Sequence, residues 1–188
     1  MRRRIPGLAL GPVVASLLIW QTSTAAFQAS TDNGPSTFAA GTVTLTDDDS
    51  SAVLFSMSNL VPLDTQTKCI KVSYTGSSFD LTPVKLYAAL PTNVDAFAAE
   101  LDVTIEQGTG GTFANCTGFT SASTLFTGTL ASLASTKTDF ASGLTGFTPA
   151  SGSVDRTYRF TVTLGSDTPN TAQGDSASAT LTWEIQSA

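Results

Sequence analysis

The chain has 188 residues, of which 9 are Lys or Arg, 15 are Asp or Glu and none is His. This length favours a single domain. Without His, the chain cannot form the two-His zinc site of a zincin or a nucleophile activated by imidazole. The excess of acidic residues would repel a phosphate backbone, so nucleic acid is excluded as an expected partner.

Residues 1–26 have the order of charge and apolarity that is typical of a secretory signal peptide. Three Arg residues at 2–4 are followed by a mainly apolar run at 8–20 and by the small residues TAA at 24–26. A membrane anchor is the alternative, but a span needs roughly 20 apolar residues and this run is shorter and contains Pro12. We expect cleavage after residue 26 and a protein secreted to the extracellular space, the cell surface or a matrix, with no membrane contact after cleavage.

Removal of this segment leaves 9 − 3 = 6 basic residues against 15 acidic ones, a net charge of about −9. Such a charge favours solubility and gives no basic cluster for an anionic partner. The next residues, 27–36, are mostly polar apart from Phe27, and Gly34 and Pro35 lie near their end. We predict a flexible N-terminal arm over 27–36 and a β-sandwich domain over 37–188.

Apolar and polar residues alternate in many segments of this domain. The clearest case is 157–164, where Tyr158, Phe160, Val162 and Leu164 would share one face. Period-two alternation indicates half-buried strands, and Gly, Asp, Asn and Pro separate the segments. We therefore predict an all-β fold with two packed antiparallel sheets. The remaining predicted strands are residues 42–46, 52–58, 68–74, 84–88, 101–105 and 179–185.

Two short helices are expected between the strands. Asn93 could cap a helix over 94–100, in which Val94, Phe97 and Leu101 have helical spacing. A second helix is expected over 130–136, and residues 165–178 are predicted to form a polar loop.

Cys69 and Cys116 are the only cysteines, and an even count in an exported chain favours a disulfide over two free thiols. Cys69 alternates with the apolar Ile70 and therefore falls on the opposite face of its strand. We expect the bridge to fasten an excursion around Cys116 to the outer side or edge of that strand, and not to join the sheets through the core.

The acidic residues offer only a limited set of candidate sites. Asp47, Asp48 and Asp49 form the one dense acidic run, which we interpret as a turn, with a low-affinity Ca²⁺ site as the alternative. Asp102 and Glu106 could serve as a pair of glycosidase carboxylates, but exposed strand polarity explains them equally well. A catalytic Ser/Lys dyad is a further alternative, but no spacing in the sequence singles out one such pair of residues. We expect no catalytic residues, no metal and no cofactor.

Five short segments, taken in order, resemble the TasA/camelysin family of exported bacterial matrix and surface proteins. They are residues 38–45 (FAAGTVTL), 55–64 (FSMSNLVPLD), 69–76 (CIKVSYTG), 128–130 (GTL) and 158–164 (YRFTVTL). The resemblance covers most of the mature chain. It implies a jelly-roll-like sandwich and assembly into extracellular or biofilm-matrix filaments. The family also has a metalloendopeptidase label, which comes from camelysin.

In such fibres the N-terminal arm of one subunit completes a sheet of the next. Carried to this chain, the donor would be the arm from Phe27 to Phe38, with the two Phe rings as apolar anchors and Gly34-Pro35 as the point of detachment. We therefore predict a non-enzymatic structural protein that associates with itself head to tail. The alternatives are an extracellular binding module that does not polymerise and a camelysin-like peptidase.

Overall fold

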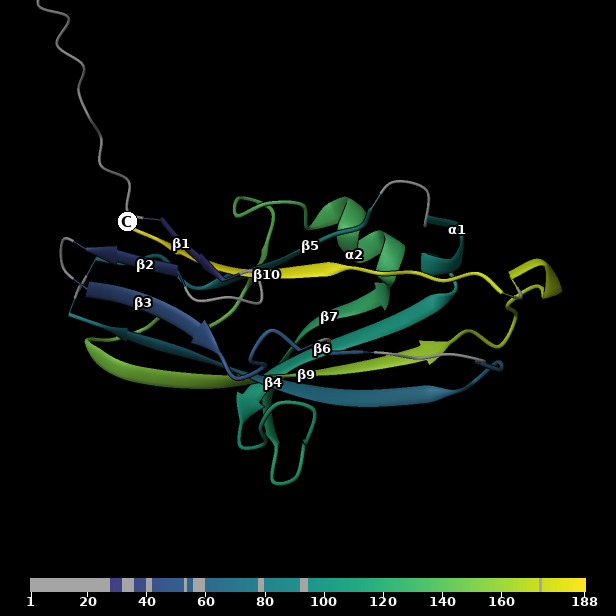
Figure 1. Cartoon of the computed structure of the whole chain (residues 1–188), viewed down its shortest axis with the longest axis horizontal. Helices are drawn as coiled ribbons and strands as arrows, with labels where there is room; N and C mark the ends of the chain where they lie inside the picture. The colour runs from purple at the N-terminus through teal and green to yellow at the C-terminus, as the bar shows by residue number, and fades with distance from the viewer. Residues whose placement is uncertain are drawn as a thin grey trace, which may run out of the picture.

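The computed structural model describes residues 28–31, 36–39, 42–52, 54–55, 60–77, 80–91, 95–172 and 174–188. These residues form two antiparallel sheets that lie one over the other (Figure 1). The predicted all-β class and the two-sheet sandwich are therefore confirmed.

The larger sheet has six strands and the smaller sheet has four. Several neighbouring strands are distant in sequence, so the chain passes repeatedly from one sheet to the other, as in a jelly roll. The order in the larger sheet is β2 (Ser36–Ala39), β3 (Thr42–Asp47), β4 (Thr65–Gly76), β9 (Gly152–Leu164), β6 (Leu101–Thr109) and β7 (Thr120–Thr129). The order in the smaller sheet is β1 (Gln28–Thr31), β10 (Thr180–Gln186), β5 (Lys85–Ala89) and β8 (Leu144–Thr145).

The core lies between the inner faces of the two sheets. Ile70, Tyr158 and Phe160 of the larger sheet are almost fully buried, as is Trp183 of the smaller one. The Trp183 ring lies edge-on to both aromatic rings, with centroids 5.5 Å from Tyr158 and 6.3 Å from Phe160. The alternation in the sequence thus identified the inward positions of β4, β9 and β10, although Ala179 is exposed and precedes β10.

The helices are short and lie between strands. Helix α2 (Leu130–Thr136) has the predicted bounds and begins at Thr129, whose hydroxyl accepts a hydrogen bond from the Ser132 N–H at 3.1 Å. Helix α1 (Asp95–Ala98) lies inside the range predicted for the first helix, whose proposed cap Asn93 lies outside the described residues. The loop over 165–178 contains one turn of 3-10 helix, η1 (Asn170–Ala172).

The strands of the structure differ from the predicted ones in several places. Residues 52, 54 and 55 of the predicted strand over 52–58 lie outside the strands, and Leu54 and Phe55 instead pack against the core. Strand β7 was not predicted, because its sequence TSASTLFTGT has little apolar alternation. It lies at the edge of the larger sheet, where hydrogen bonding to β6 on one side is enough to hold a polar strand.

The predicted arm contains backbone that is paired with the chain's own sheets. Residues 28–31 form β1, which pairs with β10, and residues 36–39 form β2, which pairs with β3. Phe27, Gly34 and Pro35 lie outside the described residues. In the described part of the chain, no helix has the length and apolarity that a membrane crossing requires.

Candidate functional site

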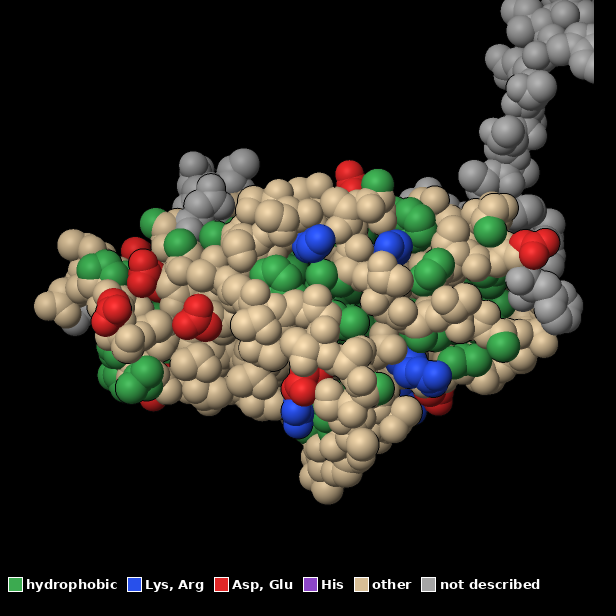
Figure 2. Space-filling model, turned by 180° about the vertical axis from the view of Figure 1, so that it is seen from behind, with side chains coloured by type: hydrophobic (Ala, Val, Ile, Leu, Met, Phe, Trp, Pro, Cys, Tyr) green, Lys and Arg blue, Asp and Glu red, His purple; other side chains and the backbone are tan. Residues whose placement is uncertain are grey.

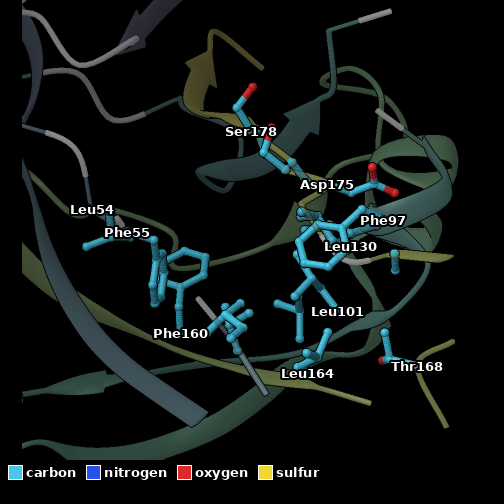
Figure 3. A pocket seen from close by; sticks show the side chains of 18 of the residues that line it. Leu54, Phe55, Phe97, Leu101, Leu130, Phe160, Leu164, Thr168, Asp175 and Ser178 are labelled. Carbon is cyan, nitrogen blue, oxygen red and sulfur yellow. The ribbon is translucent and has the colours of Figure 1, made fainter. Parts of the chain in front are cut away.

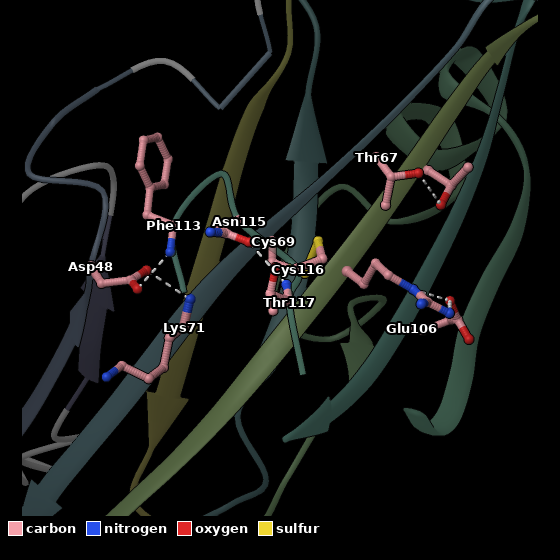
Figure 4. The surroundings of a disulfide bond; sticks show 11 residues. Asp48, Thr67, Cys69, Lys71, Glu106, Phe113, Asn115, Cys116 and Thr117 are labelled. Carbon is pink, nitrogen blue, oxygen red and sulfur yellow. Dashed lines mark hydrogen bonds and ion pairs between the residues drawn. A yellow bond between two sulfur atoms is a disulfide. The ribbon is translucent and has the colours of Figure 1, made fainter. Parts of the chain in front are cut away.

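Cys69 and Cys116 form the predicted disulfide, with their Cα atoms 5.2 Å apart. Cys69 lies on β4, and Cys116 lies in the segment between β6 and β7 (Figure 4). We call residues 110–119 the strap. The Ala114 N–H donates to the Cys69 carbonyl at 2.8 Å, so the strap also meets the backbone of β4.

The strap crosses the outer face of the larger sheet. Strand β9 lies between β6, where the strap begins, and β4, where it is bonded. Arg159 is opposite Cys69 in the β4–β9 register, and directly opposed residues share a face. The Arg159 guanidinium lies 4.6 Å from the centre of the Phe119 ring in the strap. The predicted outer position of the bridge is therefore confirmed, and the strap buries Cys69 completely.

Asp48 joins the end of β3 to both β4 and the strap. One carboxylate oxygen accepts the Lys71 N–H at 2.8 Å, and the other accepts the Phe113 N–H at 2.8 Å (Figure 4). Hydrogen bonds to an ionised acceptor are stronger than neutral ones. The Asp48 carboxylate therefore holds β4 and the strap next to the end of β3, which gives the acidic run a structural role.

Asp49 is almost buried, with an exposed fraction of 3%. Its carboxylate accepts the Ser51 N–H at 2.6 Å, and its own N–H donates to Asp47 at 3.4 Å. Burial, followed by the hydrogen bond with the Asp47 side chain, raises the pKa of Asp49 to about 6. Within the described ranges, no three Asp, Glu, His or Cys side chains form a cluster that could hold a metal ion.

The two candidate glycosidase carboxylates, Asp102 and Glu106, have different surroundings. Glu106 forms an ion pair with Arg159 and accepts its Nε–H at 2.7 Å, next to the strap. Asp102 lies farther along β6 and is exposed. The structure therefore gives Glu106 a partner in the sheet and places Asp102 in solvent.

A cavity of about 1070 Å³ lies between the sheets, at the end where β9 finishes (Figure 3). Both sheets supply apolar walls, which include Ile70, Phe160, Leu164 and Leu181. The helices add Phe97, Leu130 and Leu133, and the segment after β3 adds Leu54 and Phe55. The sequence did not predict a cavity, because alternation shows which side chains point inward but not whether they fill the space.

The polar lining of the cavity is uncharged or acidic. It includes Asp49 in the wall, and Thr168, Asn170, Asp175 and Ser178 from the loop before β10. In Figure 3 Asp175 and Ser178 lie on one side of the space and the labelled apolar side chains lie around the rest. The described residues that line the cavity include no Lys or Arg.

The N-terminal strands occupy one edge of each sheet. Strand β1 pairs only with residues 183–186 of β10, although β10 begins at Thr180. Residues 180–182 of β10 pair with residues 87–89 of β5. Strand β10 also adjoins the cavity, because Thr180, Leu181 and Trp183 line it.

Comparisons with known proteins do not assign the chain to a family. No protein-family model matches it, and a search of curated proteins finds no match. The resemblance to the TasA/camelysin family therefore stays a prediction.

The disulfide should contribute strongly to stability, because it closes a loop with a sequence separation of 47 residues. In the chain-entropy account, a loop of this size corresponds to about 4 kcal/mol of unfolding free energy. We expect the double variant Cys69→Ala/Cys116→Ala to lose a stabilisation of that order in urea denaturation. An unchanged urea midpoint would show that the strap is held without the bridge.

The buried Asp49 predicts a specific pH dependence of stability. Its pKa is higher in the folded protein than the ordinary value of 3.8, so folding favours the protonated form and stability is lost as pH rises from about 4 to about 6. Asp49→Asn keeps an acceptor for Ser51 without the charge. Thermal melts should show this variant gaining about 1–3 kcal/mol over the natural protein between pH 4 and pH 7. Asp102→Asn, at an exposed site, is the control, and its stability relative to the natural protein should not rise between pH 4 and pH 7.

Proposed function

We propose that the chain is an exported structural protein that assembles head to tail into extracellular filaments by exchanging its N-terminal strands. The observation that carries this proposal is the position of β1 and β2. The first two strands among the described residues lie at the edges of different sheets, so one short segment completes both layers of the sandwich.

The pairing of these strands is limited in extent. Each of β1 and β2 has four register pairs with one neighbour, whereas β4 is paired with β9 along all 12 of its residues. Loss of either N-terminal strand would expose a row of backbone N–H and C=O groups. An equivalent strand from another copy would satisfy the same groups.

The geometry of such an exchange favours polymers. The donor segment and the sheet edges are different surfaces, so the contact is head to tail and propagates unless its rotation closes a ring. Gly34 and Pro35 lie between β1 and β2 in the sequence, and Pro lacks an N–H for continuing a ladder. The sequence therefore separates the two strands at a point where a chain can change direction.

Export is supported by two separate features. The first 26 residues have the pattern of a signal peptide, and the disulfide suits an oxidising compartment. The face in Figure 2 shows acidic and basic side chains scattered among a majority of uncharged ones, as suits a protein in contact with water. A role in an extracellular or biofilm matrix rests on the resemblance to the TasA/camelysin family.

We propose a non-catalytic role because the chain has no His and its described carboxylates have structural partners at Asp48 and Glu106. A binding module is the second candidate, and the cavity between the sheets is the observation that favours it.

Deletion of residues 27–36 tests the proposal. We expect the mature protein to form filaments in electron micrographs and the truncated protein to remain a folded monomer by circular dichroism and light scattering. The matched control carries the same ten residues in scrambled order, which keeps length and composition but not the strand pattern. Filaments of normal appearance from the truncated protein would contradict strand exchange.

A further inference from the structure

We propose that the cavity between the sheets binds a single-chain amphiphile whose head group carries no negative charge. This site would work in a single subunit, so the inference is independent of filament assembly. The size and length of the cavity, the chemistry of its lining and the apolar turn beside it all favour such a ligand.

The cavity has the size and character of a ligand site. Its volume of about 1070 Å³ is slightly above the usual range of small-molecule pockets, which are concave, mainly apolar and lined by a few polar groups. Leu54, Phe55, Leu130, Val162 and Leu181 pack against the core but remain only partly buried. Covering them would remove apolar surface from water, which is the main source of affinity for an apolar ligand.

The lining indicates an elongated occupant. Three successive inward positions of β9, namely Phe160, Val162 and Leu164, line the space. At about 3.3 Å per residue, four steps along a strand span about 13 Å. A hydrocarbon chain can lie along such a strand and contact all three side chains.

The charged groups exclude an anionic head. Asp49 and Asp175 line the cavity, and the described lining contains no cation to oppose them. A carboxylate or phosphate head would meet like charge from the nearly buried Asp49 and the exposed Asp175. A hydroxyl or ammonium head could instead donate a hydrogen bond to a carboxylate.

An exposed apolar turn lies beside the cavity. Val61 is 58% exposed and Leu63 is 67% exposed, and Val61 also lines the cavity. The Asp64 side chain accepts the Val61 N–H at 2.9 Å, and the Leu63 N–H donates to the Leu164 carbonyl at 2.8 Å. The turn is thus fixed to the end of β9 and presents two apolar side chains where a hydrocarbon chain would enter.

The N-terminal arm of a second copy is a poorer occupant. Between Phe27 and Phe38 the arm has only small or polar residues, so it cannot cover a long apolar wall. Strand β1 also pairs with residues 183–186, of which only Trp183 lines the cavity. A neutral hydrocarbon chain fits the lining better than this segment does.

The test uses purified mature protein and the neutral fluorescent probe N-phenyl-1-naphthylamine. We expect the probe to brighten on binding and to be displaced by 1-dodecanol and by dodecylammonium, with dodecanoate weaker by about tenfold or more because of its charge. Val162→Phe fills the cavity and should weaken probe binding by about tenfold, while Thr161→Val changes the opposite face of the same strand and should not. A thermal melt checks that both variants are folded.

The exposed Asp175 gives a second variant that does not depend on the core. Asp175→Lys should bring dodecanoate close to the affinity of 1-dodecanol. Unchanged probe binding in folded Val162→Phe, or equal affinity of the natural protein for dodecanoate and 1-dodecanol, would overturn the proposal. Displacement by a synthetic peptide of residues 27–39, with none by the alcohol, would also overturn it and would identify a second copy as the occupant.

Discussion

The pairing of β4 with β9 is the constraint on which the rest of the structure depends. It joins Thr65 to Thr163 at one end and Gly76 to Gly152 at the other, so a single ladder connects distant parts of the chain. Its inner face provides Ile70 and Phe160 to the core, and its outer face carries the bridge of the strap. The Thr65 and Thr163 hydroxyls are hydrogen-bonded across the ladder at 2.8 Å, which aligns the two strands at this end.

The unequal lengths of the two sheets explain the position of the cavity. Strands β4 and β9 have 12 and 13 residues, whereas β10 and β5 have 7 and 5. At the end where β9 finishes, the described residues opposite the apolar face of the larger sheet include α1, α2 and the loop before β10. Such segments pack less regularly than a facing strand, so inward side chains such as Val162 remain partly uncovered.

The sequence predicted those features that depend on local periodicity. Alternation identified the inward faces of β4, β6 and β9, and the position of Cys69 opposite Ile70 predicted which side of the sheet the strap would cover. It did not predict β7, because the many Ser and Thr residues of this strand give it no clear apolar face. It also did not predict that residues 28–31 pair with β10. Both depend on what lies beside the segment in space. The cavity also depends on how two sheets of different length meet, and the apolar pattern of a single strand gives no information about this.

The central claim is that β1 and β2 complete a sandwich whose core is held together without them. Hydrogen–deuterium exchange of the monomeric mature protein, read by mass spectrometry, tests this claim directly, because amides in weakly held segments exchange through low-energy local opening. We expect peptides that cover residues 28–39 to exchange far faster than peptides from β4 and β9. Protection of residues 28–39 equal to that of β4 and β9 would show that the N-terminal strands belong to the same cooperative unit as the core, and would contradict the account.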